Sequence, residues 1–130
     1  MKKFESGRWM KIDWEMALPE SGDVSVLVSV EKIEHEWRRS TDKYIRAGCE
    51  NGMLRKYEIF EKWIMSAKYV KMPEVCIVND FVQFNNGRHR FAWLRDHGMT
   101  ALRINVQPTD VATFETYFGS QERTSQWLKG

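Results

Sequence analysis

The sequence predicts an α+β fold, a small mixed β-sheet packed with helices, and three observations carry that prediction. Valine occupies every second position of residues 24–30, which is typical of a strand with one buried face. Residues 56–67 instead place apolar side chains at helical spacing. The patterns follow one another as strand, helix, helix, two strands, helix, strand and helix, without the run of βαβ units that a doubly wound sheet needs.

The length of the chain, 130 residues, suits one domain over residues 1–130. Within it we expect residues 1–20 to form an irregular or extended arm that packs onto the domain, with Trp9 and Trp14 as a candidate surface for a protein partner. Residues 120–130 resemble a polar tail anchored by its tryptophan and leucine.

No apolar run approaches the roughly 18 residues of a membrane helix, and the first residues lack the apolar stretch of a signal peptide. We therefore expect a cytoplasmic protein with no membrane partner. The net charge of +2 does not by itself indicate a nucleic-acid-binding protein, so local clusters must carry any such role.

The strand at residues 24–30 is followed by a predicted helix over residues 31–39, where Ile33 and Trp37 lie four positions apart with charged residues between them. Residues 40–55 contain Gly48, Asn51 and Gly52 and show no convincing periodicity, which indicates a long loop. The helix over residues 56–67 follows.

A β-hairpin comes next, with strands at 75–78 and 81–84 joined by Asn79–Asp80, a pair suited to the positive φ angles of a tight turn. We expect residues 85–87 to form a second tight turn and residues 88–97 to form a helix.

Gly98 is placed to end that helix in the left-handed conformation. A strand at residues 102–106 and a helix that starts at residues 108–110 complete the fold. Trp63 and Trp93 lie on the predicted helices, and we expect both to be core or partly buried.

The most informative stretch is the turn into the helix at residue 88, where Asn86, Gly87, Arg88, His89 and Arg90 form the predicted binding site for a phosphate. The first turn of a helix has backbone N–H groups without partners, and the glycine permits close approach of a ligand. The arginines add bidentate donors, and the histidine adds a donor whose charge can change near neutral pH.

The alternative is an ordinary basic surface. Cations at a helix N-terminus oppose the helix dipole, so a purely structural helix favours acidic residues there, and this makes the run of three basic residues unusual. The chain contains neither a Walker-type loop nor a dinucleotide fingerprint.

These residues resemble the Gly-x-His-Arg box of the ParB/sulfiredoxin superfamily, which lies between a strand and a helix and binds nucleotide phosphates. The resemblance implies a ParB/sulfiredoxin-like fold. Sulfiredoxins have their catalytic cysteine where this chain has Arg88, and neither Cys49 nor Cys76 replaces it in sequence. The protein is therefore not expected to be a sulfiredoxin, and its two cysteines are expected to be buried or reduced thiols.

A closer resemblance is to the plasmid fertility inhibition factor family, over roughly residues 24–119. The long run from Gly87 to Gly98 is its specific part, and weaker support comes from scattered positions: Trp37-Arg38, Asp42, Tyr44-Ile45, Gly48, Tyr57, Phe60, Trp63, residues 72–75 and Phe118-Gly119.

This resemblance implies a protein of a mobile element that blocks conjugative transfer of DNA through a type IV secretion system. Relatives are reported as ATP-binding and DNA-degrading. It implies a nucleotide, ATP or another nucleoside triphosphate with Mg²⁺, as the cofactor. The implied partners are DNA and a secretion coupling protein or another conjugation component.

Two alternatives stay open. The first is an active nucleotide phosphohydrolase or DNase, with Glu36, or less favourably Glu34, as the base and His89 and Arg90 stabilising charge on the phosphate. A solvated helix face is the simpler interpretation of this carboxylate. The second is a non-enzymatic adaptor that binds a protein through the aromatic arm.

Three smaller expectations complete the set. Residues 38–43, together with Arg46, Arg55 and Lys56, form either a DNA-contacting or a solvated basic loop. His97 is expected to cap its helix as a cation. The spacing of the ligand-type residues fixes no metal site, although Asp42 or Glu36 could join nucleotide oxygens around Mg²⁺.

Overall fold

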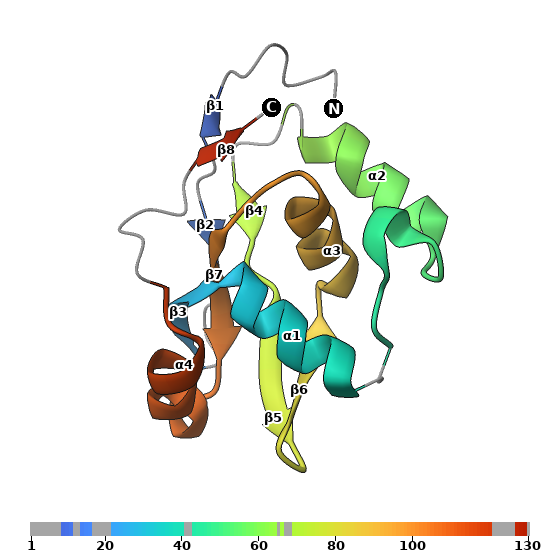
Figure 1. Ribbon diagram of the computed structural model, residues 1–130. Helices are drawn as coiled ribbons and strands as arrows, with labels where there is room; N and C mark the ends of the chain where they lie inside the picture. The colour runs from blue at the N-terminus through green and yellow to red at the C-terminus, as the bar shows by residue number, and fades with distance from the viewer. Residues whose placement is uncertain are drawn as a thin grey trace.

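The computed structural model describes residues 9–11, 14–16, 22–40, 43–64, 66, 69–120 and 127–129, the first and last of these as backbone. Its elements are helices and a mixed sheet, which confirms the α+β prediction (Figure 1). No helix in the described part of the chain is long and apolar enough to cross a membrane.

The main sheet has four strands in the order β3, β7, β5, β6, which are Val24–Ser29, Ala101–Val106, Glu74–Val78 and Phe81–Asn86. The outer pairs are antiparallel and the central pair, β5 with β7, is parallel. Val26 and Val28 are buried, as the alternation predicts. The alternating valines of β3 therefore identify the buried face of the sheet.

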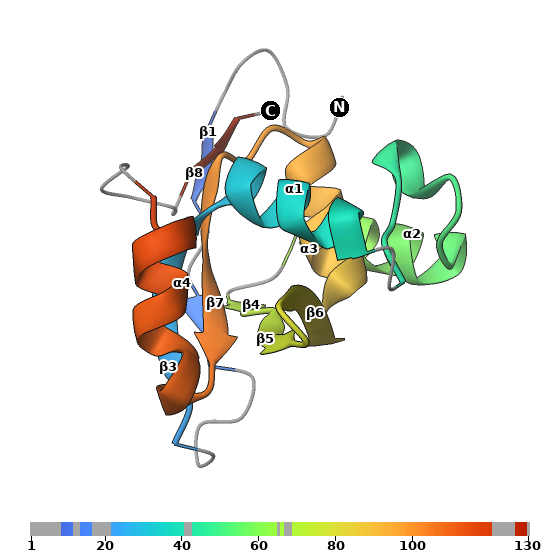
Figure 2. The same ribbon diagram turned by 60° about the horizontal axis from the view of Figure 1, so that its bottom comes forward.

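Four α-helices cover the sheet and one another: α1 (Val30–Ser40), α2 (Leu54–Ile64), α3 (Arg88–Asp96) and α4 (Val111–Phe118). Two short 3₁₀ turns, Ala47–Cys49 and Pro108–Asp110, precede α2 and α4. Helix α4 lies against β3 at one end of the molecule, and α2 lies beside α3 at the opposite end (Figures 1 and 2). Helix α1 lies between them and packs on β6.

The expected arm and tail contain strands. β1 (Trp9–Lys11) pairs antiparallel with β8 (Trp127–Lys129), so the two ends of the chain are joined. β2 (Trp14–Glu15) pairs parallel with β4 (Val70–Lys71), and the amide of Met72 donates to the carbonyl of Glu15 at 2.8 Å. The arm thus reaches the segment that leads into β5.

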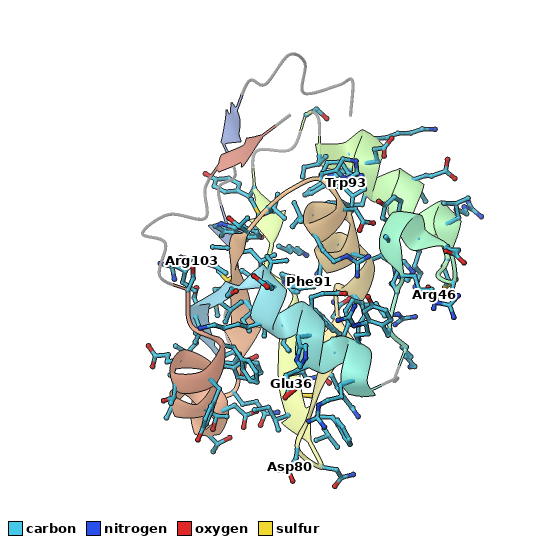
Figure 3. The ribbon with its side chains drawn as sticks, in the orientation of Figure 1. Glu36, Arg46, Asp80, Phe91, Trp93 and Arg103 are labelled. Carbon is cyan, nitrogen blue, oxygen red and sulfur yellow. The ribbon has the colours of Figure 1, made fainter. Side chains whose placement is uncertain are left out.

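Aromatic side chains fill the core. Trp37 of α1 contacts Phe84 and Phe91 at centroid distances of 4.6 and 5.7 Å. Trp93, on the side of α3 that faces α2, is fully buried, as expected (Figure 3). Trp63 is 44% exposed, so its placement in the core was wrong. Sequence spacing identifies the inner stripe of α2, whereas Trp63 lies at the edge of that stripe.

Several boundaries differ from the prediction. α2 begins at Leu54 and ends at Ile64, and the last residue of the predicted helix, 67, lies outside the described residues. The turn at Asn79–Asp80 is confirmed, with φ angles of 51° and 66°. The prediction of a second turn over residues 85–87 is wrong, because β6 continues to Asn86, which pairs with Glu74 across a bulge. The reversal therefore falls on Gly87.

Candidate functional site

The predicted phosphate turn lines a pocket of about 590 Å³, within the range of small-ligand sites. Its lining joins Arg88 and Arg90 of α3 to Lys56 of α2 and Lys71 of β4. Elements far apart in the sequence thus bring four cations to one cavity. Such a cluster suits an anionic ligand.

Gly87 is required at the start of α3 for two reasons. Its φ of 83° and ψ of 18° lie in the left-handed region, and its carbonyl accepts the first helical hydrogen bond, from Phe91 N at 2.9 Å. A β-carbon at this position would also lie 2.5 Å from Arg90 Nη2 and 3.0 Å from Pro73 Cα. The backbone angle therefore makes a side chain here strained, and Arg90 would have to move to accommodate it.

Arg90 ties the start of α3 to β4. Its Nε donates to the carbonyl of Lys71 at 3.2 Å, and its Nη2 is buried without a hydrogen-bond partner among the described residues. Burial lowers the pKa of Arg90, and Glu74 acts in the opposite direction. An arginine in a protein keeps its proton, so the pocket retains this charge.

His89 is buried, and its Nε2 accepts a hydrogen bond from the amide of Met53 at 3.0 Å. Burial, and to a smaller extent the charges of Arg88 and Lys56, lower its pKa to about 4. The side chain is therefore neutral at pH 7, and the expectation of a charge tunable near neutral pH was wrong. Its place in the phosphate site stays a prediction.

Arg88 and Asn86 are the more accessible members of the predicted set. Arg88 is half-buried and Asn86 is exposed at the end of β6, and both line the pocket. The structure therefore brings all five predicted site residues to one cavity. Arg90 and His89 are held in place by hydrogen bonds to Lys71 and Met53. The side chains of Arg88 and Asn86 are available to contact a ligand.

Three contributors to the pocket were missed in the sequence: Lys71, Glu15 and an aromatic group around Trp63. Glu15 supplies the one carboxylate among the described lining residues. It reaches the cavity through the pairing of β2 with β4, which no motif or periodicity signals. The helical spacing of Lys56 and Trp63 was visible, but not the cavity that they face.

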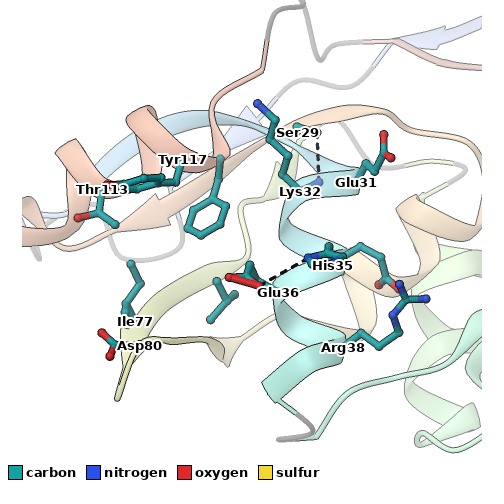
Figure 4. Close-up of a pocket in the computed structure, with 13 residues that line it drawn as sticks. Ser29, Glu31, Lys32, His35, Glu36, Arg38, Ile77, Asp80, Thr113 and Tyr117 are labelled. Carbon is teal, nitrogen blue, oxygen red and sulfur yellow. Dashed lines mark hydrogen bonds and ion pairs between the residues drawn. The ribbon is translucent and has the colours of Figure 1, made fainter.

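Glu36, the favoured catalytic carboxylate, lies elsewhere. It lines a separate groove of about 800 Å³ between α1, α4 and the β5–β6 hairpin (Figure 4). It accepts from Arg39 at 2.9 Å and lies 3.6 Å from His35. The hydrogen bond from Arg39 is the main cause that lowers its pKa. Among the described residues, none lines both the groove and the pocket, so the structure does not bring Glu36 together with His89 and Arg90.

Glu34, the second choice, belongs to a polar network. Arg95 donates to Glu34 and to Asp96, both at 2.9 Å. Asp96 also accepts from the hydroxyl of Tyr57 at 2.8 Å and from the amide of Gly48 at 2.9 Å. This network joins α1, α2, α3 and the loop before α2. The second half of the long motif that starts at residue 87 is therefore structural.

The same network explains other positions of the resemblance. Arg95 donates to the carbonyl of Ile45 at 2.6 Å, and the hydroxyl of Tyr44 donates to Glu34. Burial and that hydrogen bond raise the pKa of Tyr44 to about 12, so it remains a phenol at pH 7. These contacts hold the loop against α3.

The remaining expectations have mixed outcomes. His97 Nδ1 lies 2.7 Å from the carbonyl of Trp93 and its ring stacks on the indole, but burial lowers its pKa, which disfavours the cation that was expected. Cys49 and Cys76 are both buried thiols, as expected. Asp42 lies outside the described residues. In the part of the chain that is described, no three His, Cys, Asp or Glu side chains gather as a metal site.

No family model and no curated protein matches the chain. Among solved structures, the fold is similar to the crystal structure of Oncogenic Suppression Activity Protein, a plasmid fertility inhibition factor, in its gold(I) cyanide derivative. The TM-score is 0.51 and the identity 15%, and the match covers 83% of this chain and 61% of that one. The chain thus spans less than two thirds of the solved protein. The likeness shows a shared fold, and the ParB/sulfiredoxin assignment stays a prediction.

Proposed function

We propose that this is a fertility-inhibition-type protein that interferes with conjugative DNA transfer and binds a nucleotide or nucleic-acid phosphate in the pocket at Gly87. The fold that it shares with a plasmid fertility inhibition factor supports the biological role. The observation that carries the binding role is the convergence of Lys56, Lys71, Arg88 and Arg90 on one cavity with a helix N-terminus.

The binding role is tested by isothermal titration with ATP, CTP and GTP, with and without Mg²⁺. Arg88→Ala removes a half-buried cation that has no structural hydrogen bond among those described, and we expect it to weaken binding at least tenfold. Arg103→Ala is the matched control, because Arg103 is exposed on β7 and does not line the pocket. Absence of binding by the wild type would refute the proposal.

The biological role is tested by expression of the protein in the cytoplasm of a donor cell during conjugation. We expect fewer transconjugants with the wild type than with Arg88→Ala, and co-purification with a secretion coupling protein identifies the partner. Equal transfer with and without the wild-type protein would contradict this role.

A second candidate is a phosphohydrolase or DNase that uses the same pocket. The specific observation is Glu15, a carboxylate among the cations, which is placed to hold Mg²⁺ beside phosphate oxygens or to accept a proton from water. Mg²⁺ fits this site, because it takes one or two carboxylates and completes its shell with phosphate and water.

We assign the carboxylate of this candidate to Glu15 instead of Glu36, and variants of the two residues separate the assignments. Magnesium-dependent loss of ATP or single-stranded DNA should disappear in Glu15→Gln and persist in Glu36→Gln. The reverse pattern would restore the original assignment. An absence of turnover in the wild type would leave a binding protein.

A further inference from the structure

One stripe of α2 borders the pocket along its length. Lys56, Ile59, Phe60 and Trp63 lie at positions i, i+3, i+4 and i+7, and all four line the cavity. Phe60 is buried, but Ile59 and Trp63 are 55% and 44% exposed. Tyr69, which enters the pocket just before β4, is 52% exposed. We call Trp63 and Tyr69 the aromatic wall.

The indole of Trp63 is held from behind. Its ring packs on Phe60 with centroids 5.8 Å apart and an interplanar angle of 35°. Phe60 in turn contacts the buried Trp93 edge-on at 5.5 Å. A chain of core aromatics thus supports an indole of which nearly half remains exposed. This arrangement provides a fixed flat surface for a second ring.

The pocket lining combines cationic and aromatic side chains. Lys56 and Trp63 are seven residues apart on α2, which separates their α-carbons by about 10 Å along the helix. The cations Lys71, Arg88 and Arg90 line the same cavity. A ligand that contacts both kinds of side chain carries a phosphate and a flat apolar ring.

Resting on the proposed function, we propose that the aromatic wall stacks an unpaired nucleobase whose phosphate lies at Arg88 and Lys56. Stacking on an aromatic side chain is how proteins hold bases that are not paired, because every base has a π-face. A free nucleotide and single-stranded DNA both supply this chemistry. Duplex DNA does not, since its bases are stacked within the helix.

The test compares ligands with and without a base. ATP, inorganic triphosphate, a short single-stranded oligonucleotide and its duplex are titrated against wild type, Trp63→Ala and Trp63→Phe. We expect Trp63→Ala to weaken binding of ATP or of the single strand roughly 5- to 150-fold, the range for loss of one base–aromatic stack. Triphosphate affinity should not change, and Trp63→Phe should restore most of the loss.

The outcomes separate the inference from the function on which it rests. Equal wild-type affinity for ATP and triphosphate, with both lost in Arg88→Ala, would overturn the aromatic wall and leave the phosphate site intact. Equal affinity for single-stranded and duplex DNA would overturn base stacking from DNA, and the ATP arm would decide for a free nucleotide. Binding of no ligand would overturn both proposals. Tyr117→Ala, an exposed aromatic in the separate groove, is the control.

Discussion

The guanidinium of Arg90 occupies the space that a β-carbon on residue 87 would need, with Nη2 2.5 Å and Cζ 2.9 Å from that position. The glycine that lets the chain turn into α3 is therefore also the position against which the half-buried Arg90 packs. The turn and the cation are in direct contact at the start of α3.

The first prediction follows from this contact. Gly87→Ala should destabilise the fold and weaken phosphate binding, because it adds a clash with Arg90 to the left-handed strain of about 1–2 kcal/mol. Gly98→Ala isolates the strain, since Gly98 has a φ of 89° at the other end of α3 and open space around its β-position. Urea unfolding and ATP titration measure both variants. An equal loss of stability in the two would show that the contact with Arg90 is unimportant.

The second prediction concerns the ion pair between Arg95 and Glu34, whose side chains are largely buried. Arg95→Met removes a cation that serves Glu34, Asp96 and a backbone carbonyl, and leaves two carboxylates without it. Loss of one partner of a buried pair costs about 3 kcal/mol, so we expect a loss of this size in the free energy of unfolding.

An exposed ion pair provides the control for Arg95. Arg46 and Glu50 lie 3.4 Å apart on the surface, where such pairs contribute at most about 1 kcal/mol. Arg46→Met should therefore change the urea midpoint little. A similar shift of the urea midpoint in Arg95→Met and Arg46→Met would mean that the network around Asp96 does not hold the loop.

The third prediction tests whether the α1–α4 groove and the pocket at Gly87 are separate binding sites. Glu36→Ala should leave the affinity for ATP unchanged, because Glu36 lies in the α1–α4 groove and pairs with Arg39 rather than with the pocket. Arg38→Ala, on the same helix and in the same groove, serves as a second neutral variant. A tenfold loss of affinity in Glu36→Ala would show that the groove and the pocket bind one ligand.

Much of the fold could be predicted because its signals are local. The valine alternation of β3, the positive-φ pair at Asn79–Asp80 and Gly98 at the end of α3 depend on a few neighbouring residues. The pairing of β2 with β4 could not be predicted, since two-residue strands have no periodicity and their partners lie more than 50 positions apart.

The candidate site likewise combines residues with a local sequence signal and residues that only the fold brings together. The run from Gly87 to Arg90 is contiguous, and the sequence identified it. Lys71 and Glu15 join it only through the parallel pairing of β2 with β4. Glu36 was misplaced because helical spacing defines the buried stripe of α1 but not which of its polar sides faces the pocket. The hydrogen bond that His89 accepts likewise comes from Met53, which lies 36 residues away.

The last prediction is a pH dependence from His89. Its pKa is about 4 in the folded protein and near 6.5 in an unfolded chain, so between these values the unfolded chain binds a proton that the folded protein does not. Stability is therefore full above about pH 6.5 and falls as the pH falls towards 4.

His89→Gln keeps an acceptor for the amide of Met53 but does not titrate. Urea unfolding at about pH 7 and about pH 4.5 should show the wild type losing roughly 2 kcal/mol more than the variant. His97, whose lowered pKa acts in the same direction, is present in both proteins and cancels in the comparison. Equal losses in the two proteins would show that the buried imidazole does not control acid stability.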